Sequence, residues 1–211
     1  PELLPDLLKR LLQKAGAIKE IPTIRQIATV AIARYKDTDD GLVKELFLPA
    51  IDLLTQENDA SWIFEAWYRK EAVELFEKLG PEIDDRVLRN LLVLPKIDFE
   101  AEEVLSRIAR KAPESVVEFF CKRIAFDSEE HKGGEEKIEA IPFSFDKLCE
   151  PLSRIAGFAV RRVYELYNED DLQFEFRGAR LLKNIFPNFA DAFEAELLQL
   201  LKSGEEKAIR F

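Results

Sequence analysis

Apolar residues recur along the chain at spacings of three and four, which is the period of one face of an α-helix. Three stripes of this kind lie within residues 24–35, 104–112 and 189–201. Strand-like alternation of apolar and polar residues occurs briefly, over residues 172–176. That segment is short, is flanked by acidic residues and is followed by a helical spacing, so we interpret it as the start of a helix. The sequence predicts an all-α fold.

Proline, glycine and capping residues divide this pattern into ten or eleven short helices. Pro49 lies inside the expected helix over residues 41–57, where it removes a backbone donor and crowds the preceding turn, so we expect a kink or break near residues 45–48. Asp59 or Ser61 is the expected N-cap of a helix that reaches residue 79, and Asp98 of one that reaches residue 111. Further helices are expected at residues 1–16, 22–36, 82–94, 113–126, 144–167 with a break near Pro151, 171–186 and 188–202.

Residues 127–143 form the longest interruption of the helical pattern. They begin with a polar, acidic stretch that contains Gly133 and Gly134, and an apolar stretch follows at 138–143. We expect a flexible acidic loop here, within a single helical domain that covers residues 1–211. The chain begins at Pro1 without an initiator methionine and ends at Phe211 inside a helical pattern, so we also expect it to be a segment of a longer protein.

Three leucine-rich stretches resemble one another, at residues 4–12, 48–54 and 193–201, and each is soon followed by Gly, Asn or Asp and another helix start. Helix pairs begin near residues 1, 41 and 81, a spacing of about 40 that suits HEAT and armadillo arrays. The stretches, including the proline in Leu48-Pro49-Ala50-Ile51, resemble HEAT repeats. The resemblance implies an irregular right-handed α-solenoid of about five antiparallel helix pairs, in which neighbouring pairs bury one another's apolar faces.

Charge and cysteine content limit the classes of partner and the cellular location that we expect for the chain. The net charge of -10 opposes binding to phosphate backbones and to anionic membranes, so nucleic acid is disfavoured as the main ligand. No apolar run approaches the length of about 18 residues that a spanning helix needs. The two cysteines, Cys121 and Cys149, lie in apolar helical patterns without CxxC spacing, which indicates reduced thiols and a cytoplasmic location.

The residues that usually carry catalysis are scarce. His131 is the single histidine and lies in the expected loop, so sites that need paired histidines are excluded. A phosphate-binding glycine motif is absent as well. Adjacent acidic pairs occur at Glu102-Glu103, Asp84-Asp85 and Asp170-Asp171, but neighbours on a helix point in different directions, and we interpret them as caps and solvated positions. We expect no enzyme activity, no metal site and no cofactor.

Two aromatic groups are candidate partner-binding residues. Trp62 and Trp67 lie five positions apart near Phe64, Tyr68 and Arg69, so they point to different sides of a helix, and we expect one in the core and the other partly exposed. Phe143 and Phe145 follow the acidic loop in a non-helical segment. They either plug the helical stack from outside or contact a partner, and plugging is the commoner arrangement because exposed apolar patches are costly.

The HEAT resemblance implies a scaffold or recognition role, and our leading hypothesis is a non-catalytic module that binds a protein or peptide within a larger polypeptide. An alternative keeps nucleic acid as the ligand, as in the helical DNA glycosylases that act on alkylated bases, whose grooves are HEAT-like. In that case a ridge of basic residues would line the groove. The candidates for the ridge are Arg107, Arg110, Lys111, Arg161 and Arg162, with Arg177 and Arg180 on a further helix.

Overall fold

The computed structural model describes residues 3–34, 43–67, 69–130, 138–167, 172–187, 191–204 and 207. These residues form twelve α-helices and one π-helical segment, and no β-strand occurs in the described ranges. The all-α class predicted from the sequence is confirmed. The chain separates into two compact units, residues 1–91 and 92–211, and each is described by itself. The single domain that the sequence suggested stays a prediction.

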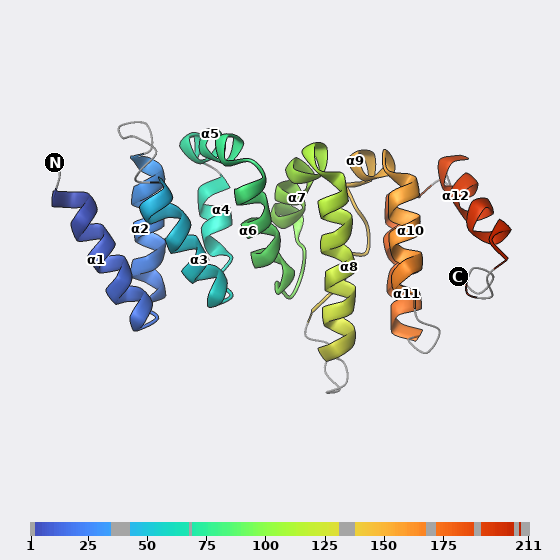
Figure 1. The fold of residues 1–211 in the computed structure, drawn as a ribbon, viewed down its shortest axis with the longest axis horizontal. Coiled ribbons are helices and arrows are strands. Elements are labelled where there is room, and N and C mark those ends of the chain that lie inside the picture. Colours follow the sequence, from blue (N-terminus) through green and yellow to red (C-terminus); the bar gives the residue numbers. More distant parts are fainter. Residues whose placement is uncertain are drawn as a thin grey trace. The chain divides into compact units, whose positions relative to one another are not determined.

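Helix α2 (Ile21–Ala33) is the central element of the first unit. It contacts five others: α1 (Leu3–Ala17), the π-helical turn η1 (Val43–Phe47), α3 (Leu48–Gln56), α4 (Ser61–Trp67) and α5 (Lys70–Leu79). Helices α1 and α2 run antiparallel (Figure 1). The buried residues of α2 include both Ile27 and Ile32, which lie on different sides of the helix. This burial is expected for a helix that is packed between neighbours.

Two positions singled out by the sequence, Pro49 and Asp59, lie at helix beginnings in this unit. Pro49 occupies the first turn of α3, and the turn before it is π-helical, so the hydrogen-bond pattern changes between Phe47 and Leu48. Phe47 itself keeps a helical backbone (φ −64°, ψ −57°), so the structure shows a change of hydrogen-bond pattern at the expected place and no interruption of the helical backbone. Asp59 precedes α4 by two residues: its Oδ1 accepts from the Ser61 amide at 3.0 Å, and its Oδ2 accepts from Arg25 Nε at 2.8 Å. The Asp59 carboxylate thereby ties α4 to α2.

The continuous helix predicted over residues 59–79 is wrong, because the structure contains two helices there. Arg69 has an extended backbone (φ −96°, ψ 125°) and precedes α5. In one continuous helix, Trp62 and Phe76 would lie about 21 Å apart along the axis. Their ring centroids are 6.3 Å apart, so the chain must turn between them. The turn lets both rings pack against Phe47. Residues 61–79 contain no glycine or proline, so the sequence of this segment does not predict a turn.

Helix α6 (Pro81–Leu92) is joined to the rest of the first unit by polar contacts. Gly80, which precedes it, adopts φ 51° and ψ −127°, a conformation that side chains with a Cβ avoid. Arg86 donates two hydrogen bonds to the Asp52 carboxylate of α3, at 2.8 Å and 3.0 Å. The buried Asn90 accepts from the Trp62 indole N–H at 2.9 Å and from the Thr55 hydroxyl at 2.8 Å. Asn90 therefore links three helices.

Helix α8 (Pro113–Glu130) is the central element of the second unit. It contacts α7 (Phe99–Lys111), α9 (Cys149–Ser153), α10 (Ala156–Leu166) and α11 (Leu172–Ile185), while α12 (Asp191–Lys202) packs on α10 (Figure 1). Helix α7 begins as predicted, because Asp98 Oδ1 accepts from the Ala101 amide at 2.9 Å. Helix α11 begins at Leu172, as expected from the interpretation of residues 172–176 as helical.

The segment between α8 and α9 differs from the expected acidic loop. Helix α8 continues to Glu130, four residues beyond the end predicted at 126. Residues 131–137, which include His131, lie outside the described residues. Residues 138–148 follow as an irregular segment, here called the 138–148 loop, and they bury Ile138, Ala140 and Ile141. This loop is thus part of the core of the second unit.

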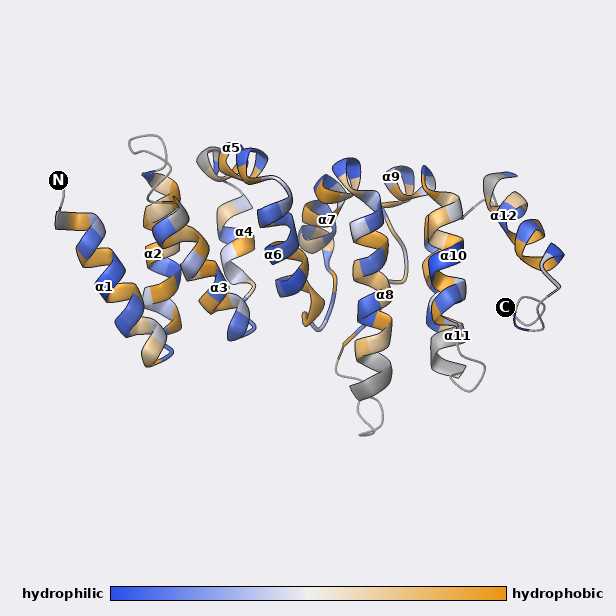
Figure 2. Ribbon diagram, in the orientation of Figure 1, coloured by the Kyte–Doolittle hydropathy of each residue, from blue (hydrophilic) through white to orange (hydrophobic). Residues whose placement is uncertain are grey.

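Hydrophilic and hydrophobic residues alternate along the helices of both units (Figure 2). Accordingly, none of the described helices combines the length and the apolar character that crossing a membrane requires. The stripe predicted within residues 189–201 is covered in part, because Phe193 is buried whereas Leu201 is exposed.

Candidate functional site

A half-open groove of about 500 Å³ lies between the 138–148 loop and helix α11, entirely within the second unit. We call it the α11 groove. Helix α11 contributes one face to it, because Phe176, Arg180 and Lys183 follow one another at spacings of four and three. The described residues that line the groove are Phe143, Ser144, Phe145, Cys149, Phe176, Ala179, Arg180, Lys183, Asn184 and Pro187.

Two exposed phenylalanines flank the groove, one from each side. Phe143 of the loop is 85% exposed, and Phe176 of α11 is 60% exposed. Burying a phenylalanine side chain is favourable by roughly 1.5–3 kcal/mol, so both rings would gain from a covering ligand. Exposed rings that flank a half-open groove are typical of a contact surface.

Arg123 of α8 fixes the beginning of the 138–148 loop. Its side chain is completely buried, and its guanidinium donates to the backbone carbonyl oxygens of Glu139 at 2.6 Å and Ala140 at 3.2 Å. The same group donates to the carbonyl oxygens of Leu92 at 2.8 Å and Leu94 at 2.9 Å. One buried cation thus satisfies four carbonyl groups that precede α7 or enter the loop, and it holds the two segments together.

Glu102 of α7 fixes the end of the same loop. It is buried, and its Oε1 accepts from the amides of Asp146 and Lys147 at 2.7 Å each and from Leu148 at 3.3 Å. The sequence predicts the Glu102-Glu103 pair to be caps or solvated positions, and for Glu102 the solvated alternative is wrong. Helix α9 begins at Cys149 and not at the predicted residues 144–146, and the three amides that Glu102 accepts directly precede it.

Helix α11 holds the middle of the loop. Asn184 Nδ2 donates to the Pro142 carbonyl at 2.8 Å, and Arg180 donates to the Ile141 carbonyl at a longer 3.5 Å. Phe145 is buried against Phe120, with ring centroids 5.0 Å apart. Phe143 therefore projects from a loop that is fixed before, beside and after it, so the exposed ring is displayed by a rigid support.

The charged side chains in the described lining of the groove are all cations. The lining contains Arg180 and Lys183 and no carboxylate, although acidic residues outnumber basic ones in the whole chain by 41 to 31. The Arg180 guanidinium lies over the Phe176 ring, 4.7 Å from its centroid, a cation–π contact that orients both groups. The groove is thus an apolar surface with a positive rim.

The predicted aromatic candidates fall into two classes. Trp62 is only 3% exposed and hydrogen-bonds Asn90, and Phe145 is buried, so these two side chains belong to the cores of their units. Trp67 is half-buried and Phe143 is exposed. The expectation that one tryptophan lies in the core and the other is partly exposed is confirmed. Of the four candidates, Phe143 and Phe145 line the groove.

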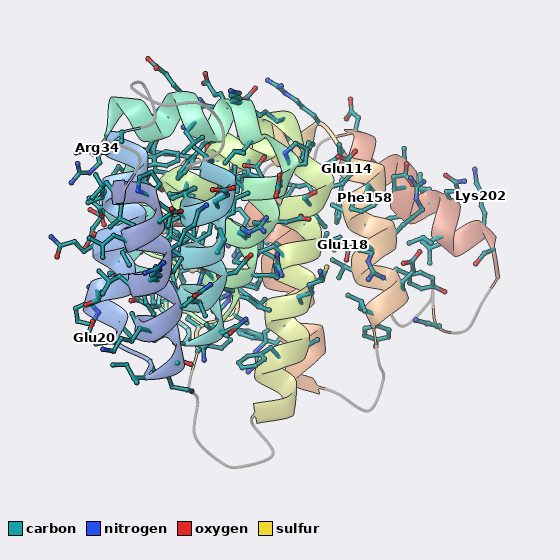
Figure 3. All side chains as sticks on the ribbon, turned by 60° about the vertical axis from the view of Figure 1, so that its left-hand side comes forward. Glu20, Arg34, Glu114, Glu118, Phe158 and Lys202 are labelled. Atoms are coloured by element: carbon teal, nitrogen blue, oxygen red, sulfur yellow. The ribbon has the colours of Figure 1, made fainter. Side chains whose placement is uncertain are left out.

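The predicted basic ridge is largely compensated by carboxylates and helix ends. Figure 3 shows Glu118 on the side of α8 that faces α10, where it accepts from Arg162 Nε. Arg161 pairs with Glu196 at 3.2 Å. Arg110 and Lys111 lie in the last turn of α7, where cations offset the helix dipole. These contacts are typical of structural ion pairs and helix ends, and they leave less positive charge for binding phosphates.

Sequence reasoning missed Phe176, Lys183 and Asn184 as site residues. Their spacing with Arg180 placed all four on one helical face, and that signal was available from the sequence alone. Their position opposite Phe143 depends on the fold and was not readable from local spacing. Among the described residues, no group of three or more His, Cys, Asp or Glu side chains could hold a metal ion.

The two cysteines differ in burial, and we expect chemical labelling to distinguish them. Burial, together with Glu118, raises the pKa of the Cys121 thiol to about 12 from an ordinary 9.0, which lowers its thiolate fraction about 1000-fold at neutral pH. Cys149 is half-buried and lines the groove. We expect iodoacetamide to label Cys149 in the folded chain and Cys121 only after denaturation, as followed by peptide mass spectrometry. Equal labelling rates in the folded chain would contradict the described burial.

The second unit thus presents an all-α scaffold with one apolar, positively rimmed groove. Comparison of the chain with protein-family models, with curated proteins and with solved structures found no match.

Proposed function

We propose that this chain is a non-catalytic, cytoplasmic protein-binding module of the HEAT-like solenoid type, and that its second unit binds a peptide segment of a partner in the α11 groove. The observation that carries the proposal is Phe143, a ring 85% exposed on a loop held by Arg123 and Glu102. A large aromatic side chain on a rigid support has the character of an interface hot spot, because little conformational entropy is lost when a partner covers it.

Several features support the solenoid part of the proposal. Elements that begin at Leu3, Val43 and Pro81 are spaced at about 40 residues, which is typical of HEAT arrays. Within each unit, a central helix contacts elements on several sides, as α2 and α8 do. Stacked repeats characteristically offer side chains of successive helices and connecting loops as binding surfaces. The nucleic-acid alternative is not advanced, because Arg161 and Arg162 are engaged with carboxylates.

Selection from a display library of random dodecapeptides tests whether the groove binds peptides. The purified chain is the target, and selected peptides are measured by fluorescence polarisation. We expect Phe143→Ala to weaken their binding by about tenfold or more, because truncating a hot-spot aromatic costs roughly 2 kcal/mol. The loop backbone is held by other residues, so the variant should keep its circular dichroism spectrum.

Phe99→Ala is the matched control for this experiment. Phe99 is also a phenylalanine of the second unit, 62% exposed, and it is not among the residues that line the groove. Its removal should leave peptide affinity unchanged. If the selected peptides bind the Phe143 and Phe99 variants equally well, or if no peptide is selected, the α11 groove is not the binding site that we propose.

A further inference from the structure

We infer that the α11 groove selects acidic amphipathic peptide segments, in which apolar side chains stand next to Asp or Glu. The inference rests on the proposed function and adds the chemistry of the partner. The described groove lining has an aromatic surface for the apolar side chains and two cations, without a carboxylate, for the acidic ones. Such a partner would be complementary to the groove in both respects.

Arg180 is the better placed of the two cations for binding a carboxylate. Its guanidinium is oriented by the Phe176 ring at 4.7 Å and, within the part of the chain that the structure describes, by one long hydrogen bond of 3.5 Å to the Ile141 carbonyl. A guanidinium carries five N–H donors in a planar fork, so most of them stay available. Because its geometry is set before a ligand arrives, a two-pronged contact with an Asp or Glu side chain requires little reordering.

Lys183 adds a second positive charge one helical turn further along the same face of α11. It is exposed, and within the described part of the chain it makes no ion pair. Residues three apart on a helix are neighbours, so one acidic segment can reach both cations. A partly exposed pair of this kind contributes modestly and depends on salt, which makes it a determinant of specificity more than of affinity.

A peptide is favoured over other anionic ligands by charge and shape together. The chain as a whole carries a net charge of -10, which repels extended polyanions such as nucleic acids and anionic membranes over distances of about 10 Å. A short peptide can enter the groove and meet the local cations without extending over the rest of this acidic chain. The exposed Phe143 and Phe176 then pack against its apolar side chains.

Three fluorescein-labelled dodecapeptides test the inference. They share the same Leu and Phe positions and differ only in whether their polar positions hold Glu, Gln or Lys. We expect the Glu peptide to bind roughly tenfold more tightly than the Gln peptide at low salt, and the difference to shrink as salt rises from about 50 to about 200 mM. Saturating Glu peptide should also slow the alkylation of Cys149, which lines the groove.

Charge-reversal variants locate the selectivity. Lys183→Glu should weaken binding of the Glu peptide roughly tenfold and leave binding of the Gln peptide nearly unchanged. Lys122→Glu is the matched control, because Lys122 is an exposed lysine of α8 that does not line the groove. The control changes the net charge by the same amount and should leave the preference for Glu intact. Binding to vesicles of phosphatidylcholine and phosphatidylserine in equal parts is measured in parallel, to test whether the groove binds an anionic membrane surface instead.

The outcomes separate this inference from the proposed function. A preference for Glu that is lost in Lys183→Glu, kept in Lys122→Glu and accompanied by protection of Cys149 supports the inference. Equal binding of the Glu and Gln peptides that still depends on Phe143 overturns the inference and leaves peptide binding in place. Peptide binding that does not depend on Phe143 overturns both. Vesicle binding that depends on Lys183, without peptide binding, assigns the groove to a lipid surface and also overturns both.

Discussion

Replacing Arg123 with methionine is expected to lower the free energy of unfolding by about 3 kcal/mol, since hydrogen bonds to charged groups contribute roughly 1.5–3 kcal/mol each and four carbonyl groups lose their donor. The net loss is smaller than the sum, because methionine also removes the cost of burying a guanidinium. Arg123 is 0% exposed, so water cannot replace it without opening the core.

Hydrogen exchange measured together with urea unfolding checks this expectation. The Glu139 amide, which donates to the Pro95 carbonyl at 2.7 Å, and the loop that follows it should lose protection first. Peptide binding in the α11 groove should weaken as well, because Phe143 loses its fixed support. Arg123→Lys should fall between wild type and Arg123→Met, since an ammonium carries three donors and lacks the planar fork that reaches both segments.

Arg154→Met is the matched control for the buried arginine. Arg154 lies in the same unit, its side chain is 62% exposed, and its ion pair with Glu150 is a surface contact. Exposed pairs of this kind contribute roughly 0–1 kcal/mol, so the control should unfold close to wild type. Equal stability of the Arg123 and Arg154 variants would show that the loop is held by its apolar side chains alone.

Local chemistry is the part of this fold that the sequence predicts. The all-helical class follows from apolar spacing, and the N-cap at Asp98 follows from a carboxylate that accepts the amide hydrogen three residues ahead. The change of hydrogen-bond pattern before Pro49 follows from the backbone donor that proline lacks. Each of these effects is complete within about one helical turn, so no knowledge of the tertiary structure is needed to foresee it.

Contacts between distant segments account for what the sequence did not predict. The break between α4 and α5 serves the packing of Trp62 on Phe76, and no residue in the break signals it. Arg123 left a partial signal, because it stands three and four residues after Phe120 and Phe119, on a face that is otherwise apolar. A cation on an apolar helical face predicts burial with hydrogen-bond partners, but not which carbonyl groups they are.

The sequence predicted the separate parts of the groove but not that they lie together, because their contact joins distant segments. Phe143 was a candidate because an aromatic residue in a non-helical segment has two fates, and the structure separates them: Phe145 is buried and Phe143 is exposed. The helical face of Phe176, Arg180 and Lys183 was visible as a spacing. That these two features border one groove follows from Asn184, which bonds a carbonyl 42 residues earlier in the chain, and a contact of that range leaves no trace in local spacing.

Trp62→Ala is expected to cause the largest loss of stability in the first unit, about 3–5 kcal/mol, the range for removing a buried tryptophan from a core. The indole packs edge-on against Phe47 and Phe76, with ring centroids 6.2 Å and 6.3 Å away. Its N–H is also one of two donors that satisfy the Asn90 side-chain oxygen. The substitution therefore opens a cavity and leaves Asn90 with a weakened set of partners.

Two further variants separate the cavity from the hydrogen bond. Trp62→Phe keeps most of the ring contacts and loses the N–H, so it should cost less, about 1–2 kcal/mol. Trp67→Ala is the control: Trp67 is the second tryptophan of the same helix, and because it is half-buried, its removal should cost less than that of Trp62. Unfolding is best followed by circular dichroism, because substituting either tryptophan alters the fluorescence itself. Equal losses for the two alanine variants would contradict the role of Trp62 in this core.

Because the α11 groove is formed entirely by residues of the second unit, a Trp62 variant that is still folded should bind the groove peptides with unchanged affinity. A parallel loss of peptide binding in folded Trp62→Phe would instead return this tryptophan to the binding surface.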